Sequence, residues 1–215
     1  MPTPTQLKIS DIVGTFEGGR PRRYNTYACT PGDKGGVSYG ELQASLSSGS
    51  LGLLLRLYQQ MGGMGIPEKT ILSAEAKETR LNNNPSFKAM LMAASVDPIM
   101  ARAQDEFFYR RFQVPAERMC LNRGFVKPLT ILTVMDSYIQ GHFTALADKV
   151  VAVEETAWVF EYLAVRKAWL THRSPLLATT TYRVNSILVA AHADNWELEA
   201  PFVVRFDDGS MHQIT

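Results

Sequence analysis

Two acidic residues, Glu17 and Asp33, carry the strongest chemical signal in this sequence. Glu17 ends an apolar helical repeat and is followed at once by Gly18 and Gly19, which leave the backbone free to turn away. Asp33 opens a glycine-rich turn further along the chain. Hydrolysis of a glycosidic bond needs at least two carboxyl groups on opposite walls of a cleft, one as acid and the other as base. The pair therefore predicts acid–base chemistry on a glycan.

Each of the two carboxylates also has a purely structural interpretation. A glutamate near a helix end is commonly a solvated surface residue, and an aspartate beside glycines is a common turn former. Their surroundings favour a function. The glycines after Glu17 leave room for a ligand, and Ser38 follows Asp33 closely enough for its hydroxyl to orient a water. Gly40 lets a sugar approach the backbone.

A third acidic residue, Asp136, lies in the otherwise apolar segment 129–143, where a helical stripe should be buried. A buried carboxylate is costly unless it is paired. Arg166 and Arg183 are the candidates for its partners, because the planar guanidinium fork binds carboxylates with two hydrogen bonds. The alternative is that both arginines extend to solvent along their apolar stems.

The elements that must position these residues are mostly helical. An apolar stripe at i, i+3, i+4 and i+7 predicts a first helix ending at Glu17; it is formed by Ile9, Ile12, Val13 and Phe16. Further helices are predicted over 50–61 (capped by Ser50), 67–81, 87–94, 98–112, 115–124, 129–143, 154–172 and 180–191. Asn82-Asn83-Asn84-Pro85 is interpreted as a helix breaker. Segment 24–48 predicts a small β element, and 202–209 a strand leading into a turn. The fold class is therefore mainly α (α+β).

Composition excludes several classes of function. The 215 residues hold 22 basic and 21 acidic side chains, so no global charge indicates a nucleic-acid or membrane partner. Apolar runs are too short to span a bilayer. The four histidines are dispersed and predict no metal site, and no motif calls for a cofactor. The spacing of Cys29 and Cys120 leaves open whether they pair.

The order of these motifs resembles the chitosanase family of glycoside hydrolases (family 46), a branch of the lysozyme-like superfamily. The resemblance implies one lysozyme-like domain over residues 1–215, with two lobes flanking a cleft. Glu17 matches the family's general acid, Asp33 its general base, and Ser38 a threonine that helps to hold the attacking water. By the same resemblance, an ionic network orients Glu17 and tunes its acidity, and it is formed by Asp136, Arg166 and Arg183. Candidate substrate contacts are Arg20, Tyr39 and Gly40.

One departure from the family concerns the substrate. Chitosanases of this family carry an aspartate shortly after the glycine-rich turn, where it recognises a glucosamine ammonium, whereas segment 47–51 here holds no acid. Arg20, Arg22 and Arg23 also lie near Glu17 in the sequence. A cleft for cationic chitosan should be acidic. The neutral-to-basic character favours peptidoglycan, whose peptides and wall polymers are negatively charged.

We therefore expect a glycoside hydrolase that cleaves β-1,4 bonds of peptidoglycan by an inverting mechanism, a muramidase of the kind found in phage endolysins and antibacterial effectors. The amino terminus lacks a Sec-type signal. The chain would be made in the cytoplasm and reach the periplasmic wall through a holin or secretion machinery, with a secretion-system or inhibitor (immunity) protein as partner. The alternatives are a chitosanase acting on chitosan and a catalytically silent wall-binding protein on the same fold.

Overall fold

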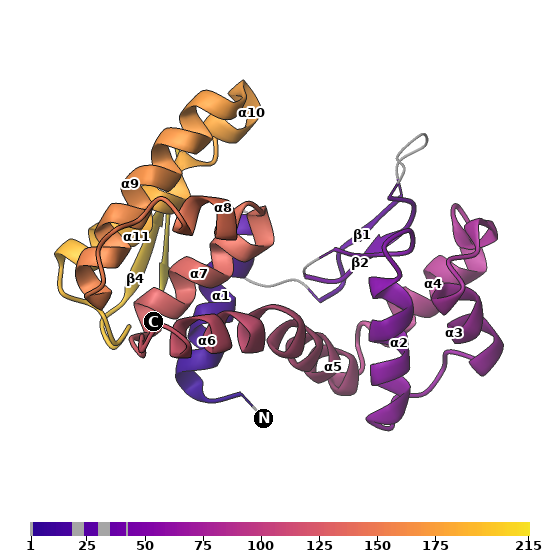
Figure 1. Ribbon diagram of the computed structural model, residues 1–215. Coiled ribbons are helices and arrows are strands. Elements are labelled where there is room, and N and C mark those ends of the chain that lie inside the picture. The colour runs from indigo at the N-terminus through magenta and orange to yellow at the C-terminus, as the bar shows by residue number, and fades with distance from the viewer. Residues whose placement is uncertain (1, 19–23, 30–34, 42) are drawn as a thin grey trace. The chain divides into compact units, whose positions relative to one another are not determined.

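The computed structural model describes residues 2–18, 24–29, 35–41 and 43–215. The chain divides into two compact units (Figure 1). Unit 1 comprises Met1–Arg20 and Tyr109–Thr215, and unit 2 is the inserted segment Pro21–Phe108.

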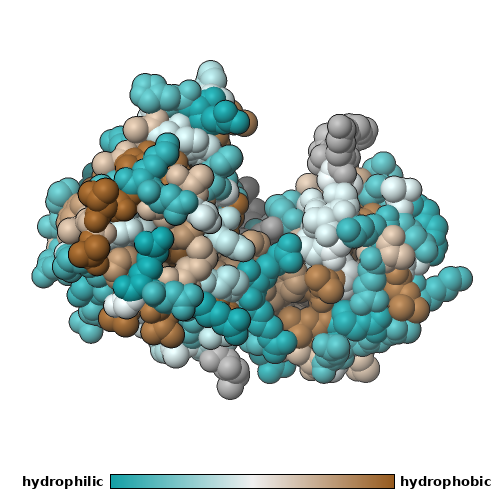
Figure 2. All heavy atoms as spheres, in the orientation of Figure 1, coloured by the Kyte–Doolittle hydropathy of each residue, from teal (hydrophilic) through white to brown (hydrophobic). Residues whose placement is uncertain are grey.

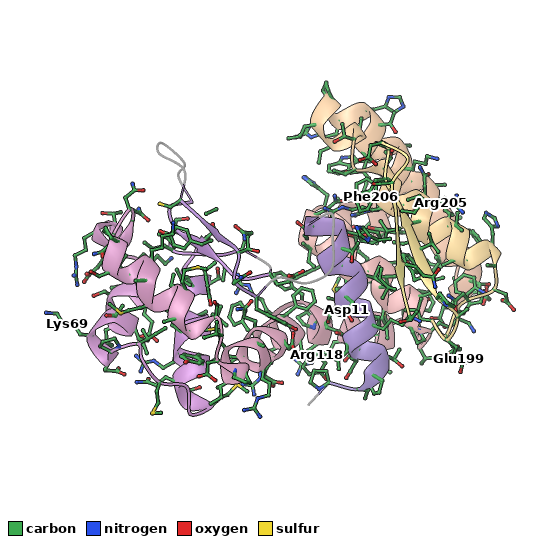
Figure 3. All side chains as sticks on the ribbon, turned by 180° about the vertical axis from the view of Figure 1, so that it is seen from behind. Asp11, Lys69, Arg118, Glu199, Arg205 and Phe206 are labelled. Carbon is green, nitrogen blue, oxygen red and sulfur yellow. The ribbon has the colours of Figure 1, made fainter. Side chains whose placement is uncertain are left out.

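Unit 1 is helical and carries one β-hairpin. Helix α1 (Pro4–Gly18) buries the predicted stripe and packs against α7 (Pro128–Gln140) and the hairpin. The hairpin pairs β4 (Phe202–Arg205) with β5 (Met211–Ile214) antiparallel, and Figure 3 shows Arg205 and Phe206 at its turn end. The other elements of unit 1 are η2 (Tyr109–Gln113), α6 (Val114–Leu121), α8 (Phe143–Ala147), α9 (Glu155–Arg173), α10 (Pro175–Ala178) and α11 (Thr181–His192).

The core of unit 1 is rich in aromatic residues. Trp158 and Tyr162 stack with ring centroids 4.8 Å apart on successive turns of α9, and both are buried. Phe143, the first residue of α8, covers the same pair. Apolar burial of this kind fixes α9 relative to α7 and α8, so the polar residues that these helices carry hold defined positions.

Unit 2 combines a three-stranded antiparallel sheet with helices. Its strands are short and lie in the order β1 (Tyr27–Ala28), β2 (Ser38–Tyr39), β3 (Ala44–Ser45). The helices are α2 (Ser50–Gln60), α3 (Glu68–Glu75), η1 (Thr79–Leu81), α4 (Pro85–Ala94) and α5 (Pro98–Phe108). One apolar cluster, which runs from Val37 in the sheet to Ala103 on α5, lies entirely within this unit.

The prediction of a mainly helical chain with a small β element after the first helix is confirmed. Several helix boundaries differ. The helix predicted over 67–81 ends at Glu75 and resumes as η1. The helix predicted over 129–143 ends at Gln140, because Gly141 and His142 both have positive φ, and α8 begins after them. The helix predicted over 98–112 becomes a π-helix at Tyr109.

The predicted cap of α2 by the Ser50 side chain is wrong. Gly49 is the N-cap, with φ 81°, and Ser50 is the first helical residue. The Ser50 hydroxyl instead accepts a hydrogen bond from the Ser45 amide at 2.8 Å, which ties the helix to strand β3. Helix α10 was not predicted. Its four residues begin at Pro175 behind the capping side chain of Ser174.

Hydrophilic residues, coloured teal, cover most of the surface in view in Figure 2, and hydrophobic patches interrupt them. Within the described ranges no helix is both long and apolar enough to cross a bilayer. No group of His, Cys, Asp and Glu in the same ranges could hold a metal ion. Cys29 and Cys120 are both free thiols.

Candidate active site

Glu17 lies one residue before the end of α1 and follows the buried Phe16. The apolar stripe of α1 faces the core, so the next position along the helix brings the Glu17 carboxyl to the surface of unit 1. Its side chain keeps 35% of its surface exposed. Oε1 accepts a hydrogen bond from Arg183 Nη1 at 2.6 Å, and Oε2 makes no hydrogen bond to any described residue. One oxygen is therefore held and the other is free to exchange a proton.

Asp136 is the centre of a buried ionic network behind Glu17. Its Oδ1 accepts from Arg183 Nη1 at 3.1 Å and its Oδ2 from Arg166 Nη2 at 3.0 Å. Asp136 and Arg166 each expose only 1% of their side chains. Arg183 Nη1 thus bridges the two carboxylates of Glu17 and Asp136. The structure brings together four predicted residues of the network, Glu17, Asp136, Arg166 and Arg183, and the solvent-extended alternative for the arginines is wrong.

Electrostatics explain why the network can be buried. When Glu17 is ionised, its carboxylate and that of Asp136 balance the two guanidiniums in charge, and paired charges of this kind can be buried. Burial alone would lower the pKa of Arg183, but the Asp136 and Glu17 carboxylates outweigh it and raise that pKa above its ordinary value. Arg183 therefore stays charged at every pH at which the protein is folded.

Two further residues complete this side of the site and were missed from the sequence. Gln140 Oε1 accepts from Arg166 Nη2 at 2.5 Å, which extends the network to the end of α7. The Tyr182 hydroxyl donates to the Phe16 carbonyl at 2.6 Å, and Arg183 Nη2 donates to the same oxygen at 3.0 Å. These two bonds hold the last turn of α1. In the sequence, the position of Tyr182 beside Arg183 could have identified it. Nothing in the sequence distinguishes Gln140.

The other predicted residues belong to unit 2 or lie outside the described residues. Asp33 and Arg20 fall outside them. Ser38 lies on β2, partly exposed, and its hydroxyl makes no hydrogen bond to a described residue. The Tyr39 ring is fully buried and donates to the Leu91 carbonyl at 3.0 Å, so it packs in the core of unit 2 and cannot stack on a sugar. This corrects its prediction as a substrate contact.

Gly40 is buried too, and packing explains why a glycine is required there. Its φ is +80°, and a Cβ at this position would lie 2.4 Å from Oε1 of Gln104. A side chain could not be accommodated, because the conformation and the space both exclude it. The structure thus gives Gly40 a role in packing the sheet against α5.

The turn around Gly49 is built from serine hydroxyls. Ser48 Oγ lies 2.8 Å from Ser45 Oγ and 2.7 Å from Ser50 Oγ. Lys77 reaches the same turn, since its Nζ lies 3.5 Å from where a Cβ on Gly49 would be. The turn therefore holds neutral hydroxyls and one cation, and none of its residues from Ser45 to Leu51 is acidic.

Comparison with known proteins relates the whole chain to one group of solved structures. No protein-family model and no curated protein matches the sequence. A chitosanase from Bacillus subtilis has a TM-score of 0.78 at 19% identity, with 99% of each chain covered. A glutamate-to-alanine mutant from the same organism, solved in complex with 6 GlcN, also has a TM-score of 0.78, at 18% identity and the same coverage.

A third solved structure agrees with these two. The GH46 chitosanase of Gynuella sunshinyii, in complex with chitotetraose, has a TM-score of 0.76 at 19% identity, and the match covers 100% of this chain and 99% of that one. Similarity of this extent, at identities below 20%, is a statement about fold. The chain therefore has the fold of the GH46 chitosanases, as the order of its motifs predicted.

Proposed function

We propose that this protein is a glycoside hydrolase that cleaves β-1,4 bonds of an amino-sugar polymer, with Glu17 as the general acid. The observation that carries the proposal is the geometry at Glu17. One carboxyl oxygen is fixed by Arg183, the other makes no hydrogen bond to a described residue, and the side chain keeps 35% of its surface exposed. A general acid needs this combination, because it must hold a defined direction while exchanging a proton with the substrate.

The ionic network supports the same role. When Glu17 gives its proton to the leaving oxygen it becomes a carboxylate. The Arg183 guanidinium, already 2.6 Å away, stabilises that charge without reorganisation. Asp136 and Arg166 hold Arg183 in place from behind. The burial of both groups keeps this support rigid.

The proposed base side is Asp33 with Ser38. In an inverting mechanism Asp33 takes a proton from water on the face of the sugar opposite Glu17, and the Ser38 hydroxyl orients that water. The mechanism requires the two carboxyl groups to be about 6.5–9.5 Å apart in the substrate complex.

Chitosan is the first substrate to test. The solved proteins whose fold this chain shares are chitosanases, and two of them were captured with 6 GlcN and with chitotetraose. This comparison favours chitosan over the peptidoglycan that the sequence favoured, although the fold by itself does not decide a substrate.

Peptidoglycan is the second candidate, and one observation favours it. Lys77 and the serine hydroxyls occupy the turn around Gly49, where an acid would be needed to attract a glucosamine ammonium. A cation there repels a polycationic substrate and tolerates an anionic one. In this case the phage or effector route through a holin or secretion machinery, with an immunity partner, remains part of the proposal.

Glu17→Gln tests the assignment of the acid. The amide keeps the shape of the side chain but has no acidic proton, so the variant should lose about 10²–10⁴-fold in rate. Release of reducing ends would be measured side by side on chitosan and on purified sacculi. Retention of more than about a tenth of the activity on the substrate that the wild type cleaves contradicts the role of Glu17 as general acid.

The matched control is Glu199→Gln. Glu199 is an exposed glutamate of unit 1 (Figure 3), and no hydrogen bond or ion pair involves its side chain among the described residues. This variant makes the same chemical change and should retain wild-type activity. A wild type that cleaves neither polymer, while binding sacculi, would favour the wall-binding alternative.

A further inference from the structure

Strand β2 is held at both ends by the side-chain amides of two residues outside the sheet. At its start, Asn82 Oδ1 accepts a hydrogen bond from the Val37 amide at 2.9 Å. At its end, Gln104 Oε1 accepts from the Glu41 amide at 3.0 Å. Asn82 follows η1 and Gln104 lies on α5, so these two amides attach the strand to the helices of unit 2.

Glycines make both contacts close. Gly36 has φ +64°, and a Cβ there would lie 2.5 Å from Asn82 Oδ1. Gly40 is matched in the same way to Gln104, whose Oε1 would lie 2.4 Å from a Cβ. Each amide therefore packs directly on a glycine backbone. Gly36 and Gly40 thus each leave room for one amide side chain.

Burial alternates along β2 and the residue before it. Val37 and Tyr39 are fully buried and Ser38, between them, is partly exposed. Side chains alternate across a strand, so a slip of one residue would bury Ser38 and expose its neighbours. Because β2 pairs over only two residues with each neighbouring strand, the ladder alone fixes this register weakly. The amides supply hydrogen bonds beyond the ladder on both sides of Ser38.

Gln104 also holds the segment that precedes β1. Its Nε2 donates to the Tyr24 carbonyl at 2.8 Å, while Oε1 holds Glu41, and the side chain is only 6% exposed. A buried amide with donor and acceptor both satisfied has one defined orientation. Gln104 thus connects α5 to Tyr24, which precedes β1, and to Glu41, which follows β2.

The Asn82-Asn83-Asn84-Pro85 motif, interpreted from the sequence as a helix breaker, serves three separate purposes. Asn82 holds the turn, and Asn83 takes up the left-handed conformation with φ 54°. Asn84 caps α4, since its Oδ1 accepts from the Phe87 amide at 3.0 Å. Asn82 and Asn84 make bonds of nearly equal length in one loop, and only the first bond involves β2.

We infer that Asn82 and Gln104 are positioning residues that clamp β2, and so hold Ser38 where it can orient the attacking water. The inference rests on the proposed function for the role of Ser38, but the clamp itself is a property of unit 2. Neither residue touches the substrate in this assignment. Both act through the backbone of the strand.

The test compares Asn82→Leu with two other variants, Asn82→Asp and Asn84→Ala. Loss of the acceptor should lower kcat about 10- to 100-fold with KM little changed, because small displacements of a reacting group have effects of this size. Asn82→Asp keeps an acceptor oxygen in the same place and should restore most of kcat. Asn84→Ala removes the equivalent bond at α4, so it should lower the melting temperature and leave kcat unchanged.

A second measurement does not depend on activity. Hydrogen exchange of backbone amides, followed by NMR, should be at least about tenfold faster for Val37 in Asn82→Leu and for Glu41 in Gln104→Met than in the wild type. Unchanged exchange at both amides overturns the clamp. A kcat loss in Asn84→Ala equal to that in Asn82→Leu overturns the positioning role. If the wild type cleaves neither polymer, the proposed function fails, and the exchange data still decide whether the clamp exists.

Discussion

Asp136 is the residue on which the ionic network of unit 1 depends. It accepts hydrogen bonds from both Arg166 and Arg183 and is almost completely buried. Its position could be predicted from the sequence, because a carboxylate inside an apolar helical segment must find a cation. The bridge that Arg183 makes to Glu17 follows from no local pattern, and only the resemblance to the chitosanase family implied it. It joins residues 166 positions apart, and their approach depends on the packing of α1 against the rest of unit 1.

Asp136→Ala should lower the free energy of unfolding by about 3–5 kcal/mol, because it leaves Arg166 buried without a counter-charge and removes one of the two carboxylates that pair with Arg183. Chemical denaturation measures the loss. Glu68→Gln is the control, since it breaks the exposed pair with Arg56 and should cost far less. A loss in Asp136→Ala no larger than in the control would contradict the structural importance of the network.

At the scale of elements, patterns of apolar residues located most helices, and their ends depended on features that the patterns do not contain. Helix α7 stops at Gln140 because two residues with positive φ follow it. Helix α9 begins where the Glu154 carboxylate accepts from the Ala157 amide at 2.9 Å. The sequence placed this start within one residue, since a polar residue before an apolar repeat favours a cap.

The cap of α9 predicts a dependence on pH. Hydrogen bonds from the Thr156 hydroxyl and from backbone amides lower the pKa of Glu154 from 4.5 to about 2. A lowered pKa means that the stabilisation is complete above about pH 4.5 and is lost as the pH falls through about 2. Glu154→Ala should therefore melt at a lower temperature than the wild type near neutral pH, and the difference should shrink in acid. Melting curves that differ equally at both pH values would contradict this role.

At the scale of the whole molecule, the proposed catalytic residues are divided between two compact units of the chain. Glu17 belongs to unit 1, and Asp33 and Ser38 belong to unit 2. Unit 2 is inserted between α1 and the remainder of unit 1. The fold class and the order of motifs were predictable, because each helix follows its local pattern. The hydrogen bonds that Asn82 and Gln104 make beside β2 were not predictable. The local sequence identifies Asn82 only as a loop residue and Gln104 only as a helix residue.

The self-contained core of unit 2 predicts that this segment folds alone. Its buried cluster, from Val37 to Ala103, draws no residue from unit 1. A fragment of residues 21–108 should therefore show helical circular dichroism and one cooperative melting transition. Dispersed amide NMR signals would confirm a fixed core, and a random-coil spectrum would show that unit 2 needs the rest of the chain.

The central claim is that Glu17 and Asp33 act as acid and base on opposite faces of a β-1,4-linked sugar. Proton NMR of the first products formed by the wild-type protein from a chitosan oligosaccharide, or from a peptidoglycan fragment, tests it most directly. The inverting mechanism predicts that the new reducing end appears first as the α-anomer and then mutarotates, because water attacks from the face opposite the leaving group. First appearance of the β-anomer would contradict it.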